Sequence, residues 1–224
     1  MTFSLLGIDR ESGRVGAVIS SSSPAVAARC VAVRAGVGAA ASQNVTDPRL
    51  AGRLLDLLAA AAPPQQAIEE LVVSEPDIGH RQLLAIDVQG RVADYSGEHT
   101  LGTHAAARGT DAVAGGNLLA ATSVPARMVE AFEAEAGDAL GDRLIAALRA
   151  GLAGGGEEGP VRSAGLLIAD AVAWPVADLR VDWADDPVEE LARLWQLWAP
   201  QSDLYVQRAL DPSDAPSFGV PGDE

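Results

Sequence analysis

Thr2 carries the side chain in this sequence that is best placed to act as a nucleophile. An initiator methionine is removed efficiently when the second residue is small, and threonine meets that condition. The α-amine exposed by removal has a reference pKa of about 7.7–8.0, so a good fraction of it is neutral at physiological pH. It can take a proton from its own Oγ, so one residue supplies nucleophile and base. Many proteins without this chemistry also begin Met-Thr.

Two further polar segments could complete a site around such a nucleophile. A corner at Gly115-Gly116-Asn117 could present backbone N–H groups and the Asn117 amide, which are the donors an oxyanion requires. An ordinary tight turn explains the same residues equally well. The run His80-Arg81-Gln82 opens an apolar strand and indicates a polar cluster near a site, although a histidine there could equally cap the strand.

The remaining histidines and the single cysteine form no metal motif. His99 and His104 are five residues apart, which matches no common zinc arrangement. Cys30 lies among small apolar residues, where a buried structural role fits better than nucleophilic chemistry. Gly-rich phosphate loops and a Gly-x-Ser-x-Gly motif are also absent from the sequence. We therefore expect neither a metal nor a cofactor.

The charge balance limits the partners and the compartment. A net charge of -15 and an isoelectric point near 4.5 argue against a nucleic-acid partner, because a phosphate backbone requires a basic face. All 16 basic residues are arginines, which excludes a lysine base. One cysteine allows no internal disulfide, and neither a signal peptide nor an apolar run of about 20 residues occurs. We expect a cytoplasmic protein without a membrane segment.

Turn and capping signals divide the chain into alternating groups of strands and helices. Residues 3–8 and 15–20 predict a hairpin, and Asp47-Pro48 followed by Pro63-Pro64 predicts a pair of helices. Further strands are expected within 30–42 and at 80–87, 91–95, 110–114, 163–168 and 179–181, with helices from 123, around 140–148 and from 186. This order indicates one α+β domain over residues 1–210, followed by a disordered acidic tail at 211–224.

Several segments, taken in order, resemble a known bacterial family. They are Thr2-Phe3-Ser4, the turn from Asp9 to Gly13, Ala35-Gly36-Val37-Gly38-Ala39 leading to Gln43, His80-Arg81-Gln82-Leu83, Gly116-Asn117-Leu118 and Asp178-Leu179-Arg180-Val181-Asp182. Together they resemble the family catalogued as domain of unknown function 1028, which is regarded as similar to N-terminal-nucleophile (Ntn) hydrolases. The resemblance extends over about residues 2–197.

The resemblance implies a fold, a nucleophile and a reaction class. The fold would be a four-layer αββα sandwich of the Ntn-hydrolase type, with Thr2 as nucleophile at the start of the first strand. The activity usual for such folds is hydrolysis of an amide bond. For a reaction of this class we expect Asn117 or backbone N–H groups to stabilise the oxyanion, and Gln43, His80, Arg81 and Gly116 to bind or orient the substrate.

Two departures from related patterns affect this reading. Other Ntn enzymes tune the threonine with a lysine, so an arginine or His80 would have to serve here. Arg162-Ser163 stands where members of the family tend to have Gln-Ser. From the sequence we hypothesise that the protein is an amidohydrolase acting on a small amide. The alternative is a non-catalytic binding or assembly module with the same fold. Trp195 and Trp198 make a homo-oligomer possible, although burial against their own core is the simpler account.

Overall fold

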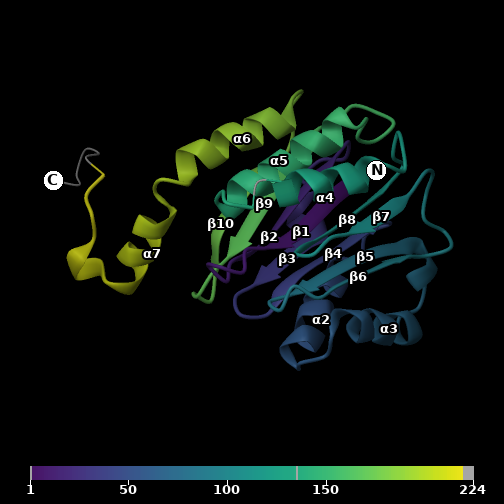
Figure 1. Cartoon of the computed structure of the whole chain (residues 1–224), viewed down its shortest axis with the longest axis horizontal. Coiled ribbons are helices and arrows are strands. Elements are labelled where there is room, and N and C mark those ends of the chain that lie inside the picture. The colour runs from purple at the N-terminus through teal and green to yellow at the C-terminus, as the bar shows by residue number, and fades with distance from the viewer. Residues whose placement is uncertain (1, 135, 219–224) are drawn as a thin grey trace.

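The computed structural model describes residues 2–134 and 136–218, and its strands form two antiparallel sheets (Figure 1). The first sheet has six strands in the order β10-β9-β2-β1-β8-β7. Its members are β1 (Thr2–Ile8), β2 (Val15–Ser21), β7 (Ala105–Arg108), β8 (Ala112–Asn117), β9 (Ser163–Ala169) and β10 (Pro175–Val181). The second sheet has the order β3-β4-β5-β6, from β3 (Val31–Arg34), β4 (Gly38–Asn44), β5 (Arg81–Asp87) and β6 (Val92–Ser96).

Helices cover the outer face of each sheet, so the layers run helix, sheet, sheet, helix (Figure 1). α2 (Pro48–Ala59) and α3 (Pro64–Ser74) pack on the four-stranded sheet. α4 (Val124–Ala134), α5 (Leu140–Ala153) and α6 (Pro187–Trp198) pack on the six-stranded sheet. The shorter elements are α1 (Ala27–Cys30), α7 (Ser202–Leu210), η1 (Ile78–His80) and η2 (Pro212–Asp214). The predicted mixture of helices with antiparallel strands is confirmed.

The alternation of side chains along β1 decides what faces the second sheet. Phe3 and Leu5 pack toward α4 and α5, whereas Leu6 and Ile8 pack between the two sheets. Because successive side chains in a strand point to opposite faces, Thr2 belongs to the face between the sheets. The layer between the sheets is therefore apolar along most of its length and polar at the end where β1 begins.

The helix-capping residues predicted from the sequence occur in the structure. Asp47 caps α2 by accepting a hydrogen bond from Arg49 N, with Pro48 at the first helical position. Asp186 caps α6 in the same way. Other segments differ from the expectation: His80 ends η1 and does not open β5, and residues 115–117 are the last three of β8, so the tight-turn reading is wrong.

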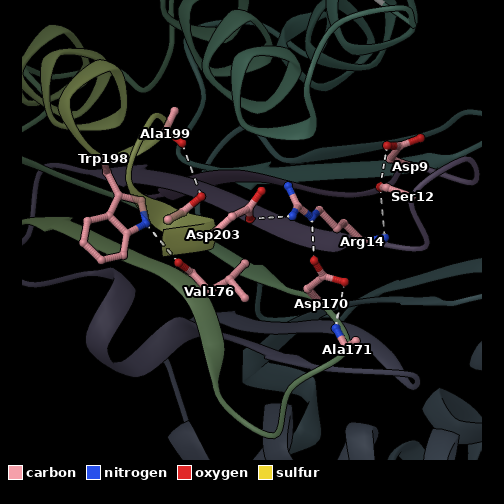
Figure 2. Close-up of polar contacts among 10 residues, drawn as sticks. Asp9, Ser12, Arg14, Asp170, Ala171, Val176, Trp198, Ala199 and Asp203 are labelled. Carbon is pink, nitrogen blue, oxygen red and sulfur yellow. Dashed lines mark hydrogen bonds and ion pairs between the residues drawn. The ribbon is translucent and has the colours of Figure 1, made fainter. Parts of the chain in front are cut away.

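The C-terminal part of the described chain docks against the edge of the six-stranded sheet (Figure 2). Arg14 donates to Asp170 Oδ2 at 2.7 Å and to Asp203 Oδ1 at 2.8 Å, which ties the end of the first hairpin to α7. Trp198 Nε1 donates to Val176 O at 2.9 Å. Trp198 therefore packs within its own chain, which is the simpler of the two explanations offered for this residue in the sequence analysis. Of the tail expected at 211–224, residues 211–218 are described and include η2, and residues 219–224 lie outside the described residues.

Candidate functional site

Thr2 lies at the end of the six-stranded sheet, between two other strand ends. β1 pairs with β8 in a register that sets Thr2 opposite Asn117, and its pairing with β2 places Phe3 opposite Ser20. Thr2 Oγ1 donates to Ser21 Oγ at 3.4 Å, and only 4% of Thr2 is exposed. The first strand thus presents its hydroxyl inside the protein, at the polar end of the layer between the sheets.

A network of amides from the facing sheet meets Thr2's neighbours there. Gln43 on β4 and Gln82 on β5 are paired residues, and Gln43 Nε2 donates to Gln82 Oε1 at 2.9 Å. Asn117 Nδ2 donates to the same oxygen at 3.1 Å, and Ser4 Oγ donates to Gln43 Oε1 at 2.8 Å. All four side chains are fully buried. These hydrogen bonds connect the two sheets directly below the start of β1.

The carbonyl of Gly116 fixes the orientation of this network. Gln82 Nε2 donates to Gly116 O at 3.1 Å, and a carbonyl can only accept. Gln82 must therefore present Oε1 to both Gln43 and Asn117, so the Asn117 amide donates one N–H to Gln82. Its second N–H remains able to donate, and among the described residues Asn117 Oδ1 has no hydrogen-bond partner. A buried amide oxygen without a partner is costly and marks a place where a donor would bind.

Ser21 links Thr2 to a positive charge. Ser21 Oγ lies 2.8 Å from Ser23 Oγ, and Arg29 Nη2 donates to Ser23 Oγ at 2.7 Å. The hydroxyls of Thr2, Ser21 and Ser23 therefore form a chain that ends at a guanidinium. The sequence contains no lysine, and Arg29 is the cation that this chain of hydroxyls connects to Thr2.

A segment of residues 157–162, called here the crossing segment, passes over the sheet end where β1 begins. At one side Glu157 bridges Leu119, just after β8, and Glu158 N donates to Leu118 O at 2.9 Å. At the other side Arg162 N donates to Ser21 O at 2.8 Å. β1 lies between β8 and β2 in the sheet, so the segment spans the end of β1.

Glu157 is a buried acidic residue at this end of the sheet. It is 4% exposed, and neither carboxylate oxygen has a hydrogen-bond partner of ordinary distance and angle among the described residues. Burial raises the pKa of the Glu157 carboxyl, because removal from water disfavours the charged form, and Ser22 lies close enough to oppose that rise. A buried carboxylate is unfavourable unless a hydrogen-bond donor or a cation lies beside it.

The structure gathers some of the sequence-predicted residues and not others. Thr2, Asn117, Gln43 and Gly116 belong to one polar cluster through the contacts above. His80 does not join it: its side chain is exposed, and its ring lies 4.6 Å from the ring of His99.

Arg81 also lies apart from the cluster. It precedes Gln82 and so belongs to the opposite face of β5, and its guanidinium donates to Val45 O. Binding of a substrate by Arg81 at Thr2 therefore has no support in this geometry.

Sequence reasoning marked Gln82 only as part of the run His80-Arg81-Gln82 and gave it no role, and it missed Ser4 and Glu157 as site residues. Strand alternation could have found Gln82 and Ser4, since Gln82 shares a face with Leu84 and Ile86, and Ser4 shares one with Leu6. Glu157 follows three glycines in a stretch that looks like a surface loop, and no local signal marks it as buried.

Surface hollows in the described structure include three at a distance from this cluster. One is lined by residues such as Gly36 and Asp87, a second by Arg14 and Val176, and a third by Thr110 and Arg143. No group of three or more His, Cys, Asp or Glu side chains within residues 2–134 and 136–218 is arranged to hold a metal ion. No helix in the same ranges has the length and apolar character needed to cross a membrane.

The protein is thus an α+β protein with two stacked antiparallel sheets and a buried polar cluster at the start of its first strand. The chain belongs to the family described as "Family of unknown function (DUF1028)", which it matches over residues 2–191. It is similar to the crystal structure of a protein of that family from Silicibacter pomeroyi, with 28% identity and a TM-score of 0.81 over 87% of this chain and 84% of that chain. No curated protein matches it.

Proposed function

We propose that this protein is an N-terminal-nucleophile amidohydrolase that cleaves the C–N bond of a small amide, with a sandwich of the Ntn-hydrolase type. The position of Thr2 is the main support for this proposal. Thr2 is buried at the start of a central strand, its Oγ1 is hydrogen-bonded to Ser21, and its strand partner Asn117 lies beside it. A nucleophile fixed in this way needs little reorganisation before it reacts.

The proposed reaction uses atoms of Thr2 for two roles. After Met1 is removed, Thr2 Oγ1 attacks the amide carbonyl carbon while its proton moves to the α-amine. The second N–H of Asn117 stabilises the oxyanion. The α-ammonium then protonates the leaving nitrogen as the C–N bond breaks, which leaves an ester on Thr2. Water, deprotonated by the same amine, hydrolyses that ester and restores the hydroxyl.

Arg29 takes the electrostatic role that a lysine fills in other Ntn enzymes. Its guanidinium polarises Ser23 and, through Ser21, the hydroxyl of Thr2. A positive charge at the end of a hydrogen-bond chain favours removal of the Oγ1 proton. Gln43 supports the network from the second sheet, and His80 and Arg81 have no part in it.

Turnover by a protein that begins at Thr2 tests the proposal. A fusion cleaved to leave Thr2 as first residue is screened against small amides and ureides. Thr2→Ala should lower turnover roughly a thousandfold or more, whereas Thr2→Ser, which keeps a hydroxyl and an amine, should retain part of it. Full turnover by Thr2→Ala would rule out this mechanism.

The low exposure of Thr2 favours one alternative, a non-catalytic binding or assembly module with the same fold. Mass spectrometry of the protein made in its natural form can exclude the hydrolase. Retained Met1 would block the amine and support the module, whereas removal of Met1 is required by the hydrolase and is also expected from the small second residue alone.

A further inference from the structure

Glu157 has no part in the proposed reaction, but it lies close to the start of β1. It bridges Leu119 beyond the end of β8 and lies beside Ser22 beyond the end of β2. Thr2 sits between those two strand ends, with Asn117 and Ser21 on either side. In an antiparallel sheet the backbone nitrogen of the first strand residue lies at that same end. Glu157 thus flanks the end of the sheet at which the Thr2 nitrogen lies.

No described side chain supplies Glu157 with a positive charge. Arg29, after β2, donates to Ser23 and to the carbonyls of Pro24 and Ala25. Arg162, at the far end of the crossing segment, pairs with Asp185. The neighbouring Glu158 is exposed and carries the same charge as Glu157.

We infer that Glu157 is a positioning residue whose carboxylate accepts a hydrogen bond from the Thr2 α-amine once Met1 has been removed. This inference rests on the proposed function and adds to it the group that orients the base. The bond would aim one amine N–H at Glu157 and leave the nitrogen lone pair free to turn toward Oγ1. It would also supply a donor to a buried carboxylate that has only Ser22 close by and no hydrogen bond of ordinary geometry among the described residues.

The test reads the amine itself and needs no substrate. Because the chain contains no lysine, the α-amine is the only primary amine, and acylation followed by mass spectrometry reports on it alone. In protein cleaved to begin at Thr2, the pH midpoint of acylation gives the amine pKa. A carboxylate in contact stabilises the ammonium, so Glu157→Gln should lower the midpoint by about one unit, a tenfold change in neutral amine below the midpoint.

Glu158→Gln is the matched control, since it removes an exposed carboxylate one residue away and should leave the midpoint unchanged. Equal midpoints in wild type and Glu157→Gln would overturn the inference. If Glu157→Gln fails to fold, the wild-type protein still decides: its midpoint should be higher when folded than when unfolded in urea. A folded midpoint equal to or below the unfolded one would overturn the inference.

The inference and the proposed function fail in different ways. A midpoint that depends on Glu157 in a protein that hydrolyses no amide supports the positioning role and counts against the hydrolase. Turnover that depends on Thr2, together with a midpoint independent of Glu157, supports the hydrolase and overturns the positioning role.

Discussion

Gln82 holds the polar cluster together because its amide makes contacts in four directions. Its Oε1 accepts from Gln43 and Asn117, and its Nε2 donates to Ser96 Oγ and to Gly116 O. Every one of its hydrogen-bonding positions is used, and the side chain is fully buried. Loss of this amide therefore leaves several buried groups without partners at once.

Gln82→Leu should consequently lower the free energy of unfolding by more than about 3 kcal/mol, since each buried group left unpaired costs about 1–3 kcal/mol. Ser96→Ala removes one half-buried partner of the same amide and should cost about 1 kcal/mol. Urea denaturation of both variants at neutral pH measures the difference. A Gln82→Leu protein as stable as Ser96→Ala would show that the network contributes little.

The sequence predicted part of this cluster, for reasons that lie in single residues. Thr2 and Asn117 stand out by type and place, and both occur in it. The sequence analysis assigned substrate binding to Arg81 and not to Gln82, because a guanidinium is a common ligand-binding group. Alternation along β5 instead puts Gln82, and not Arg81, on the face between the sheets. The burial of Glu157 depends on the path of the crossing segment, which no neighbouring residue specifies.

Elements were predictable where their own residues carry the signal. The caps at Asp47 and Asp186 fixed the starts of α2 and α6. β7 was missed because its four residues, three of them alanine, show no alternation. α7 was missed because it is held by tertiary contacts, such as the ion pair between Asp203 and Arg14, rather than by a strong apolar face.

Two helical glycines give opposite predictions for the same substitution. Gly52 in α2 has open space where a Cβ would stand, so Gly52→Ala should stabilise the protein by up to about 1 kcal/mol. In α5 a Cβ on Gly141 would lie 2.2 Å from the ring of Trp195, which is rigid and packed. Gly141→Ala should therefore destabilise by about 1–3 kcal/mol. Thermal unfolding checks both, and a stabilised Gly141→Ala protein would contradict the packing of α5 on α6.

At the scale of the whole molecule, the strand pairs were easier to predict than the sheets they form. The hairpin of β1 and β2 follows from a local turn, but the pairing of Ser21 with Ser163 joins residues far apart in sequence. Nothing in a single sequence specifies such a partner. The stacking of the two sheets depends on these long-range pairings, and so does the meeting of Thr2's neighbours with Gln43 and Gln82.

The stacking can be tested at a point of close approach between the sheets. A Cβ on Gly115 in β8 would lie 2.9 Å from Leu84 Cδ2 in β5. Gly115→Ala alone should destabilise by about 1–2 kcal/mol through overpacking. Leu84→Val alone should cost about 1 kcal/mol through lost packing.

Together the two changes should cost less than their sum by at least about 0.5 kcal/mol, because the shorter valine makes room for the new methyl group. The control pairs Gly115→Ala with Leu83→Val, since Leu83 packs on the helix side of β5 and cannot relieve the contact. That pair should be additive. Unfolding free energies of the six proteins close both cycles, and equal coupling in the two would mean that the sheets do not face each other in this register.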